Sequence, residues 1–95
     1  MMTEILPTTI DEAVVYVIAK TSPEIQARVA QRPKEDLILE HFGLGLWIRN
    51  NLGFYDRNSE LLKACSKNSI FFHPDEASGM ILEAVWLKLK EKSLS

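Results

Sequence analysis

Signals for the beginning and end of helices recur along this chain, and they constrain its fold more than any other feature. Thr9 is followed three residues later by Glu12, which is the pattern of a helix-capping box. Ser22 before Pro23 is typical of a helix start, as is Pro74 before two acidic residues. Between these signals apolar residues recur at helical spacing. The sequence therefore predicts an all-α fold.

These signals divide the chain into about five helices. The expected segments are residues 9–20, 23–32, 34–51, 60–65 and 74–90. One segment is ambiguous, because the β-branched run VVYVI at residues 14–18 also suits a strand. We expect one compact bundle over residues 1–95, since this length supports one core and the chain has no internal repeat. Residues 1–8 are expected to be a leader and residues 91–95 a frayed tail.

The segment 34–51 is predicted to be the central helix of this bundle. Its apolar residues point in every direction on a helical wheel, which is typical of a helix enclosed by its neighbours. Gly43 and Gly45 would each cost about 1 kcal/mol relative to alanine in a helix interior. Such glycines indicate positions where another element approaches the backbone closely.

Three residues on one face of this predicted helix form a candidate site. His41, Gly45 and Arg49 are spaced four residues apart, so that the glycine leaves a notch between two nitrogen-bearing side chains. A partly buried arginine needs an acidic partner to offset its desolvation. We expect Asp75 to be that partner. The alternative is the carboxylate or phosphate of a ligand, bound also by His41, Asn50, His73 and the free amide groups at the start of the last helix.

No metal, cofactor or catalytic site is predicted. Cys65, His41 and His73 lack the spacing of metal-binding motifs, and no glycine-rich phosphate loop is present. Nothing in the local sequence places Cys65 beside a base, so we expect a small buried side chain rather than a nucleophile. The sequence thus favours a protein that is not an enzyme, without excluding one.

Composition limits the other classes of partner. A net charge of -2 argues against nucleic-acid binding. A local basic patch could form from Arg28, Arg32 and Lys34, but these residues are interpreted as solvated surface charge. The single cysteine cannot form an internal disulfide, which fits a reducing cytoplasm. The chain has neither a secretory signal nor an apolar run of about 18 residues, so no membrane association is expected.

Two blocks of the sequence, HFGLGLWIRN at residues 41–50 and HPDEAS at residues 73–78, carry a family resemblance. They resemble a family of small bacterial and phage-associated domains of unknown function with an H-F-G-x-G-x-W-I-R-N block and an H-P-D-x-A-S block. The resemblance covers most of the chain and implies no activity. It marks as motif positions His41, Gly43, Gly45, Trp47, Arg49, Asn50, His73, Pro74, Asp75 and Ser78.

These observations favour a small intracellular module that docks to another protein, as antitoxins, immunity proteins and phage inhibitors do. A strip on the last helix formed by Met80, Ala84 and Leu87 either packs on an internal helix, which is the preferred interpretation, or is an exposed interface for a protein partner or a second copy of the chain. The alternative function is a small-molecule or anion site, with or without enzymatic activity, built around His41, Arg49 and Asp75.

Overall fold

The computed structural model describes residues 6–52, 59–66 and 74–94 and confirms the all-α class. The described residues form five α-helices and one 3₁₀ helix, and they contain no strand. In chain order these are α1 Ile10–Lys20, α2 Pro23–Gln31, the 3₁₀ helix η1 Lys34–Glu40, α3 Leu44–Asn51, α4 Ser59–Ser66 and α5 Pro74–Leu94. The ambiguous run VVYVI lies within α1 and is helical. The last helix extends to Leu94, beyond the expected start of a frayed tail.

The first two helices begin where the cap signals predict. The Thr9 side chain accepts a hydrogen bond from the Glu12 amide at 3.1 Å, and Ser22 Oγ accepts one from the Ile25 amide at 3.3 Å. The Glu12 carboxylate accepts from the backbone amide and the hydroxyl of Thr8, at 3.0 and 3.2 Å. The backbone hydrogen bond from Thr8 is the main reason that the pKa of Glu12 is lowered. These hydrogen bonds also attach Thr8, the last residue of the expected leader, to the first turn of α1.

The prediction of one helix over residues 34–51 is wrong. The segment is divided into η1 and α3 by a turn at residues 41–43, and Gly43 at the start of α3 has the non-helical dihedrals φ -101° and ψ -98°. Side chains three residues apart lie in one row on a 3₁₀ helix. The inner row of η1 contains Leu37 and Glu40, which are 9% and 2% exposed. The other two rows face outward, so this part of the segment is not enclosed.

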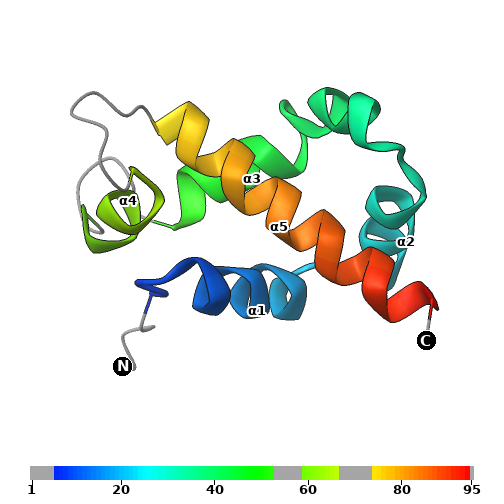
Figure 1. Cartoon of the computed structure of the whole chain (residues 1–95), viewed down its shortest axis with the longest axis horizontal. Coiled ribbons are helices and arrows are strands. Elements are labelled where there is room, and N and C mark those ends of the chain that lie inside the picture. Colours follow the sequence, from blue (N-terminus) through cyan, green and yellow to red (C-terminus); the bar gives the residue numbers. More distant parts are fainter. Residues whose placement is uncertain (1–5, 53–58, 67–73, 95) are drawn as a thin grey trace.

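The centre of the bundle is α5 instead. Figure 1 shows α5, coloured yellow to red, crossing the molecule between the other helices, and it packs against α1, α2, α3 and α4. Its buried apolar side chains are Ala77, Ile81, Leu82, Val85 and Leu89. They join Val17 of α1, Val29 of α2, Ile48 of α3 and Leu61 of α4 in one hydrophobic core. The central position therefore belongs to the last helix.

Candidate functional site

The buried guanidinium of Arg49 lies at the junction of η1, α3 and α5. Arg49 is 6% exposed, and its Nε forms an ion pair with Asp75 Oδ1 at 3.2 Å. Its Nη1 donates to Ser78 Oγ at 3.3 Å and lies 3.4 Å from His41 Nε2, while Nη2 donates to the His41 carbonyl oxygen at 3.4 Å. The internal Arg49–Asp75 pair expected from the sequence is thus present. The acceptors around this arginine all come from the fold itself.

The two partners of that pair differ in their environment. The Asp75 side chain is 60% exposed, whereas the Arg49 side chain is 7% exposed. Ser78 is fully buried, and its hydroxyl also donates to the Asp75 carbonyl oxygen at 2.9 Å. The cluster therefore connects the last turn of α3 to the first turn of α5, and its carboxylate is open to solvent.

The notch at Gly45 is filled by the protein. A Cβ added at Gly45 would lie 3.3 Å from the Glu40 carbonyl oxygen and 3.8 Å from Arg49 Nη1. Close backbone approach at this glycine is therefore present, and the approaching backbone is the end of η1. Asn50, another predicted site residue, is exposed, and His73 lies outside the described residues. The structure brings together His41, Gly45, Arg49 and Asp75.

A second ionic cluster was not predicted. Glu40 accepts two hydrogen bonds from Arg28, at 3.0 and 2.8 Å, and another from Arg32 Nε. Burial by itself raises the pKa of Glu40, but the hydrogen bonds and charges of both arginines together lower it. The Arg28 and Arg32 side chains are 50% and 26% exposed, so they are surface charges as expected, but they also attach η1 to α2 through Glu40, which was not predicted. Glu40 follows Leu37 at the three-residue spacing of η1, and that spacing is the only sequence signal of its burial.

The candidate interface strip on α5 is mostly covered. Met80 and Ala84 are partly buried against the core, and Leu87 is 55% exposed. Ala84 and Leu87 line a groove of about 420 Å³ together with residues of α1, including the 68% exposed Val15. Ala84 and Leu87 of the strip therefore lie on one wall of a groove between two helices, and Met80 does not line it.

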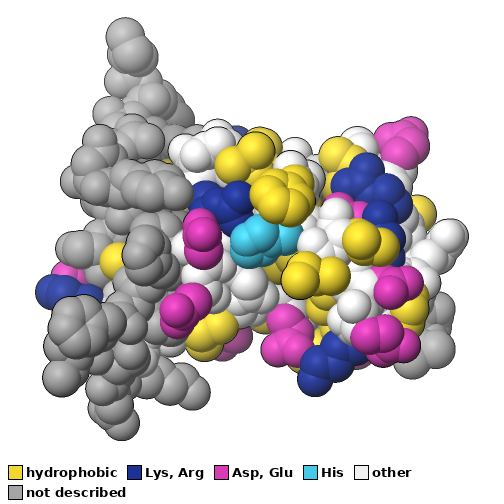
Figure 2. All heavy atoms as spheres, turned by 90° about the horizontal axis from the view of Figure 1, so that it is seen from above, with side chains coloured by type: hydrophobic (Ala, Val, Ile, Leu, Met, Phe, Trp, Pro, Cys, Tyr) yellow, Lys and Arg dark blue, Asp and Glu magenta, His cyan; other side chains and the backbone are white. Residues whose placement is uncertain are grey.

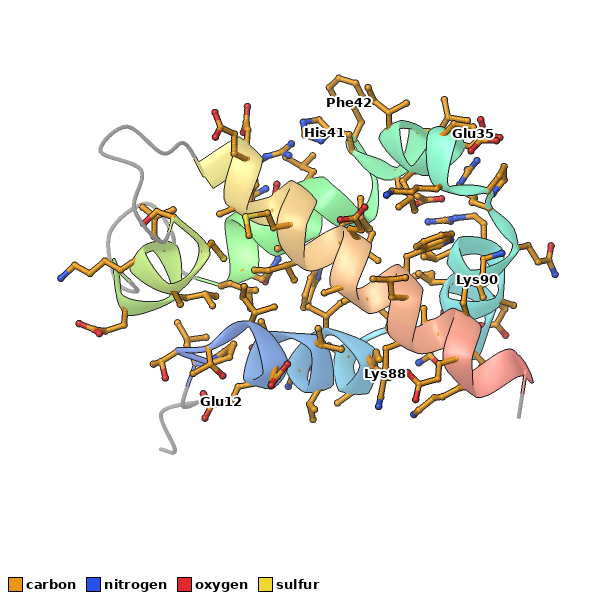
Figure 3. The ribbon with its side chains drawn as sticks, viewed as in Figure 1. Glu12, Glu35, His41, Phe42, Lys88 and Lys90 are labelled. Carbon is orange, nitrogen blue, oxygen red and sulfur yellow. The ribbon has the colours of Figure 1, made fainter. Side chains whose placement is uncertain are left out.

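A larger apolar surface lies on η1 and the beginning of α3. Phe42 is 81% exposed, Ile38 72%, Leu39 60% and Leu46 42%, and we call these four residues the η1 patch. The His41 ring lies edge-on to Phe42, with ring centroids 5.7 Å apart, and both side chains project from the turn between η1 and α3 (Figure 3). Figure 2 shows hydrophobic side chains beside the cyan histidine and acidic ones on its other flank. On an α-helical wheel of residues 34–51 these apolar side chains cannot be told apart from core residues, so the sequence did not predict this surface.

Comparison with known proteins identifies the family. Residues 6–89 match the model of a family described as a domain of unknown function, DUF6794. The chain belongs to the DUF6794 family. Both sequence blocks that carried the resemblance fall inside the matched residues. The search of curated proteins and the search of solved structures returned no significant match.

The single cysteine of this DUF6794 domain is buried. Cys65 of α4 is 2% exposed, as expected for a small buried side chain, and burial raises the pKa of its thiol. Within the described segments, no three His, Cys, Asp or Glu residues are grouped as a metal ion would require. None of the helices in those segments combines the length and apolarity needed to cross a bilayer.

Proposed function

We propose that this DUF6794 domain is a protein-binding module that docks through the η1 patch. The observation that supports this most directly is the exposure of four large apolar side chains on one short segment, with Phe42 81% exposed. Grouped exposure of this kind is typical of interaction sites in soluble domains, and aromatic residues are enriched at interfaces. A role like that of antitoxins, immunity proteins and phage inhibitors, which act by docking to another macromolecule, fits this small acidic chain in the cytoplasm.

The segment that carries the patch is held rigidly. Glu40 on the inner row of η1 is bound by Arg28 and Arg32, and Leu37 on the same row is buried. The following turn is held by the contacts of Arg49 with His41. A surface that is ordered before binding loses little conformational entropy when a partner docks. The patch therefore has the preorganisation that a binding surface needs.

The charges around the patch indicate the chemistry of its partner. Glu35 and Asp36 lie one 3₁₀ turn before Ile38 and Leu39, so each carboxylate shares a row with a patch residue. Glu76 lies beside Asp75, next to the Arg49 cluster. In the part of the chain that the structure describes, Glu35, Asp36 and Glu76 form no ion pair. A partner with an apolar centre and a basic rim complements this surface.

The small-molecule alternative at Arg49 has weaker support. A ligand anion would have to displace Ser78, His41 or Asp75 from the guanidinium, because Arg49 donates to each of these residues. The buried position of Arg49 leaves little of the guanidinium open to such a ligand. We therefore rank docking through the η1 patch first and this anion site second.

Two pairs of exposed apolar residues allow a matched test of the docking surface. Ile38→Ala/Phe42→Ala truncates the η1 patch, and Val15→Ala/Leu87→Ala truncates the α1–α5 groove at residues of similar exposure. Neither pair changes the net charge, and exposed truncations alter stability by only about 0.5 kcal/mol each. Circular dichroism verifies that both variants are folded.

Wild type and both variants are immobilised and exposed to a lysate of the source organism, and the bound proteins are compared by mass spectrometry. We expect a protein that is retained by wild type and by the groove variant, lost by the patch variant, and released at raised salt. If the patch variant retained this protein and the groove variant lost it, the interface would lie on α1 and α5 instead. Identical retention by all three proteins would refute docking at either surface.

A further inference from the structure

A pocket of about 280 Å³ lies where the end of α1, the middle of α2 and the start of α3 meet. It is separate from the η1 patch and from the Arg49 cluster, since none of the residues of either group lines it. Its volume is slightly below the usual range of about 300 to 1,000 Å³ for drug-sized ligands. The pocket is therefore large enough for a small organic molecule only.

The floor of the pocket is apolar and firmly held. It is formed by Ile25, Leu44 and Trp47, of which Leu44 is 5% exposed and belongs to the core. The Trp47 ring packs against the Tyr16 ring with a centroid distance of 6.4 Å, and this contact helps to hold it in position. Such a floor suits a flat or compact apolar body.

The rim of the pocket is cationic. Lys20 and Arg28 line it, and none of the described residues that line it is acidic. Arg28 is positioned through its Nε and Nη2 by Glu40, which leaves Nη1 outside that pair. The group of Arg28, Arg32 and Glu40 has two positive charges and one negative charge, and the Lys20 ammonium group lies over the Tyr16 ring, 5.5 Å from its centroid. The net charge of the whole chain is -2, so this pocket is locally opposite in sign to the molecule.

The absence of a side chain at Gly43 keeps one edge of the pocket open. A Cβ at this position would lie 3.4 Å from Glu40 Oε1 and 3.8 Å from Arg28 Nη2. Gly43 also precedes α3, and no side chain caps the start of this helix. The partial positive charge at the N-terminus of α3 adds to the charges of Lys20 and Arg28.

We propose that this pocket binds a small organic carboxylate with an apolar, ring-sized body. The body packs on Ile25 and Trp47, and the carboxylate lies between Lys20 and Arg28. A singly charged carboxylate suits this rim because Glu40 already occupies the Nε–Nη2 edge of the Arg28 guanidinium and neutralises part of its charge. A free phosphate would bring no apolar surface to the floor.

The two tryptophans of the chain provide the measurement. Trp47 lines the pocket, whereas the Trp86 indole donates to the Arg32 carbonyl oxygen at 2.7 Å and does not line it. The ¹⁵N-labelled full chain is titrated with 3-phenylpropionate, with 3-phenylpropylamine and with inorganic phosphate, while both indole N–H signals are followed by NMR. We expect a saturable shift at Trp47 with the carboxylate, with a Kd in the millimolar range for so small a probe. We expect a shift several-fold smaller with the amine and with phosphate.

Substitution of one rim cation tests the assignment further. Lys20→Gln should weaken binding of 3-phenylpropionate roughly five-fold, as expected for loss of one exposed charge contact. Lys63→Gln on α4 is the matched control and should leave binding unchanged, because Lys63 is an exposed lysine that does not line the pocket. The proposal is overturned if the Trp47 signal does not respond, if the amine or phosphate shifts it equally, or if Lys20→Gln binds like wild type. This outcome is independent of the η1 patch, because no patch residue lines the pocket.

Discussion

Replacing Glu40 with glutamine should strongly destabilise the domain, although the side chain hardly changes in size. Glu40 is 2% exposed and accepts hydrogen bonds from Arg28 and Arg32. Hydrogen bonds to a charged group contribute about 1.5 to 3 kcal/mol each. The two arginine side chains are 50% and 26% exposed, so water solvates them when the pair is lost, and this reduces the net effect.

A glutamine can still accept from one arginine, but its amide group faces the other donor. We therefore expect Glu40→Gln to lower the free energy of unfolding by about 2 to 4 kcal/mol. A loss of about 3 kcal/mol corresponds to a decrease in Tm of about 12 to 24 °C for a domain of this length. Urea denaturation followed by circular dichroism gives the free energy directly. Glu35→Gln is the control on the same helix, because Glu35 is exposed and should change stability by less than about 0.5 kcal/mol.

The effect should also depend on pH in a defined direction. The pKa of Glu40 is lowered in the folded protein, so its carboxylate stabilises the fold above its ordinary pKa of 4.5. That contribution is lost as the pH falls through the lowered folded-state pKa. The stability difference between wild type and Glu40→Gln should therefore be constant near neutral pH and decrease in acid. Equal stabilities of Glu40→Gln and Glu35→Gln at neutral pH, or a difference that persists in strong acid, would refute this reasoning.

Two further predictions use the same denaturation assay. Gly79→Ala should stabilise the domain by about 0.5 to 1 kcal/mol, because the new Cβ would meet none of the described atoms within 4 Å in the interior of α5. Gly45→Ala should show a smaller gain or a loss, because its Cβ would lie 3.3 Å from the Glu40 carbonyl oxygen, and an equal gain at both glycines would contradict the close approach. Arg49→Ala should cost about 2 kcal/mol through its contacts with Ser78 and His41. Asp75→Asn should lower the free energy of unfolding by less than about 1 kcal/mol, since this carboxylate is 60% exposed. If Asp75→Asn were more destabilising than Arg49→Ala, the carboxylate would be the essential partner.

The parts of the fold that depend on short-range chemistry could be predicted from the sequence. The caps at Thr9 and Ser22 require only hydrogen bonds three residues away, and both are present. The Arg49–Asp75 pair was also predicted, because a buried arginine on a helical row requires an acid and few acidic residues lie on an inward face. These predictions needed no knowledge of how the helices cross.

Apart from that ion pair, features that depend on tertiary contacts could not be predicted in this way. Glu40 is 12 and 8 residues distant from Arg28 and Arg32, and nothing local indicates that η1 turns back onto α2. Without that contact, a continuous α-helix over residues 34–51 is the natural interpretation of the apolar pattern. Under that interpretation Ile38 and Phe42 belong to the core, whereas they are 72% and 81% exposed. The η1 patch could therefore not be predicted, because an α-helix was expected where the structure has a 3₁₀ helix.

The change of helix type also explains why the apolar surface is exposed at all. Leu37, Ile38 and Leu39 are consecutive, and on a helix with three residues per turn they must occupy three different rows. Only one row can face α2 and the core, and Glu40 fixes that row as the one containing Leu37. Rotating η1 to bury Ile38 or Leu39 would expose Leu37 and remove Glu40 from both arginines. The exposure of Ile38 and Leu39 is thus imposed by the ionic contacts beneath them, and the docking that we propose at the η1 patch would require no rearrangement of the fold.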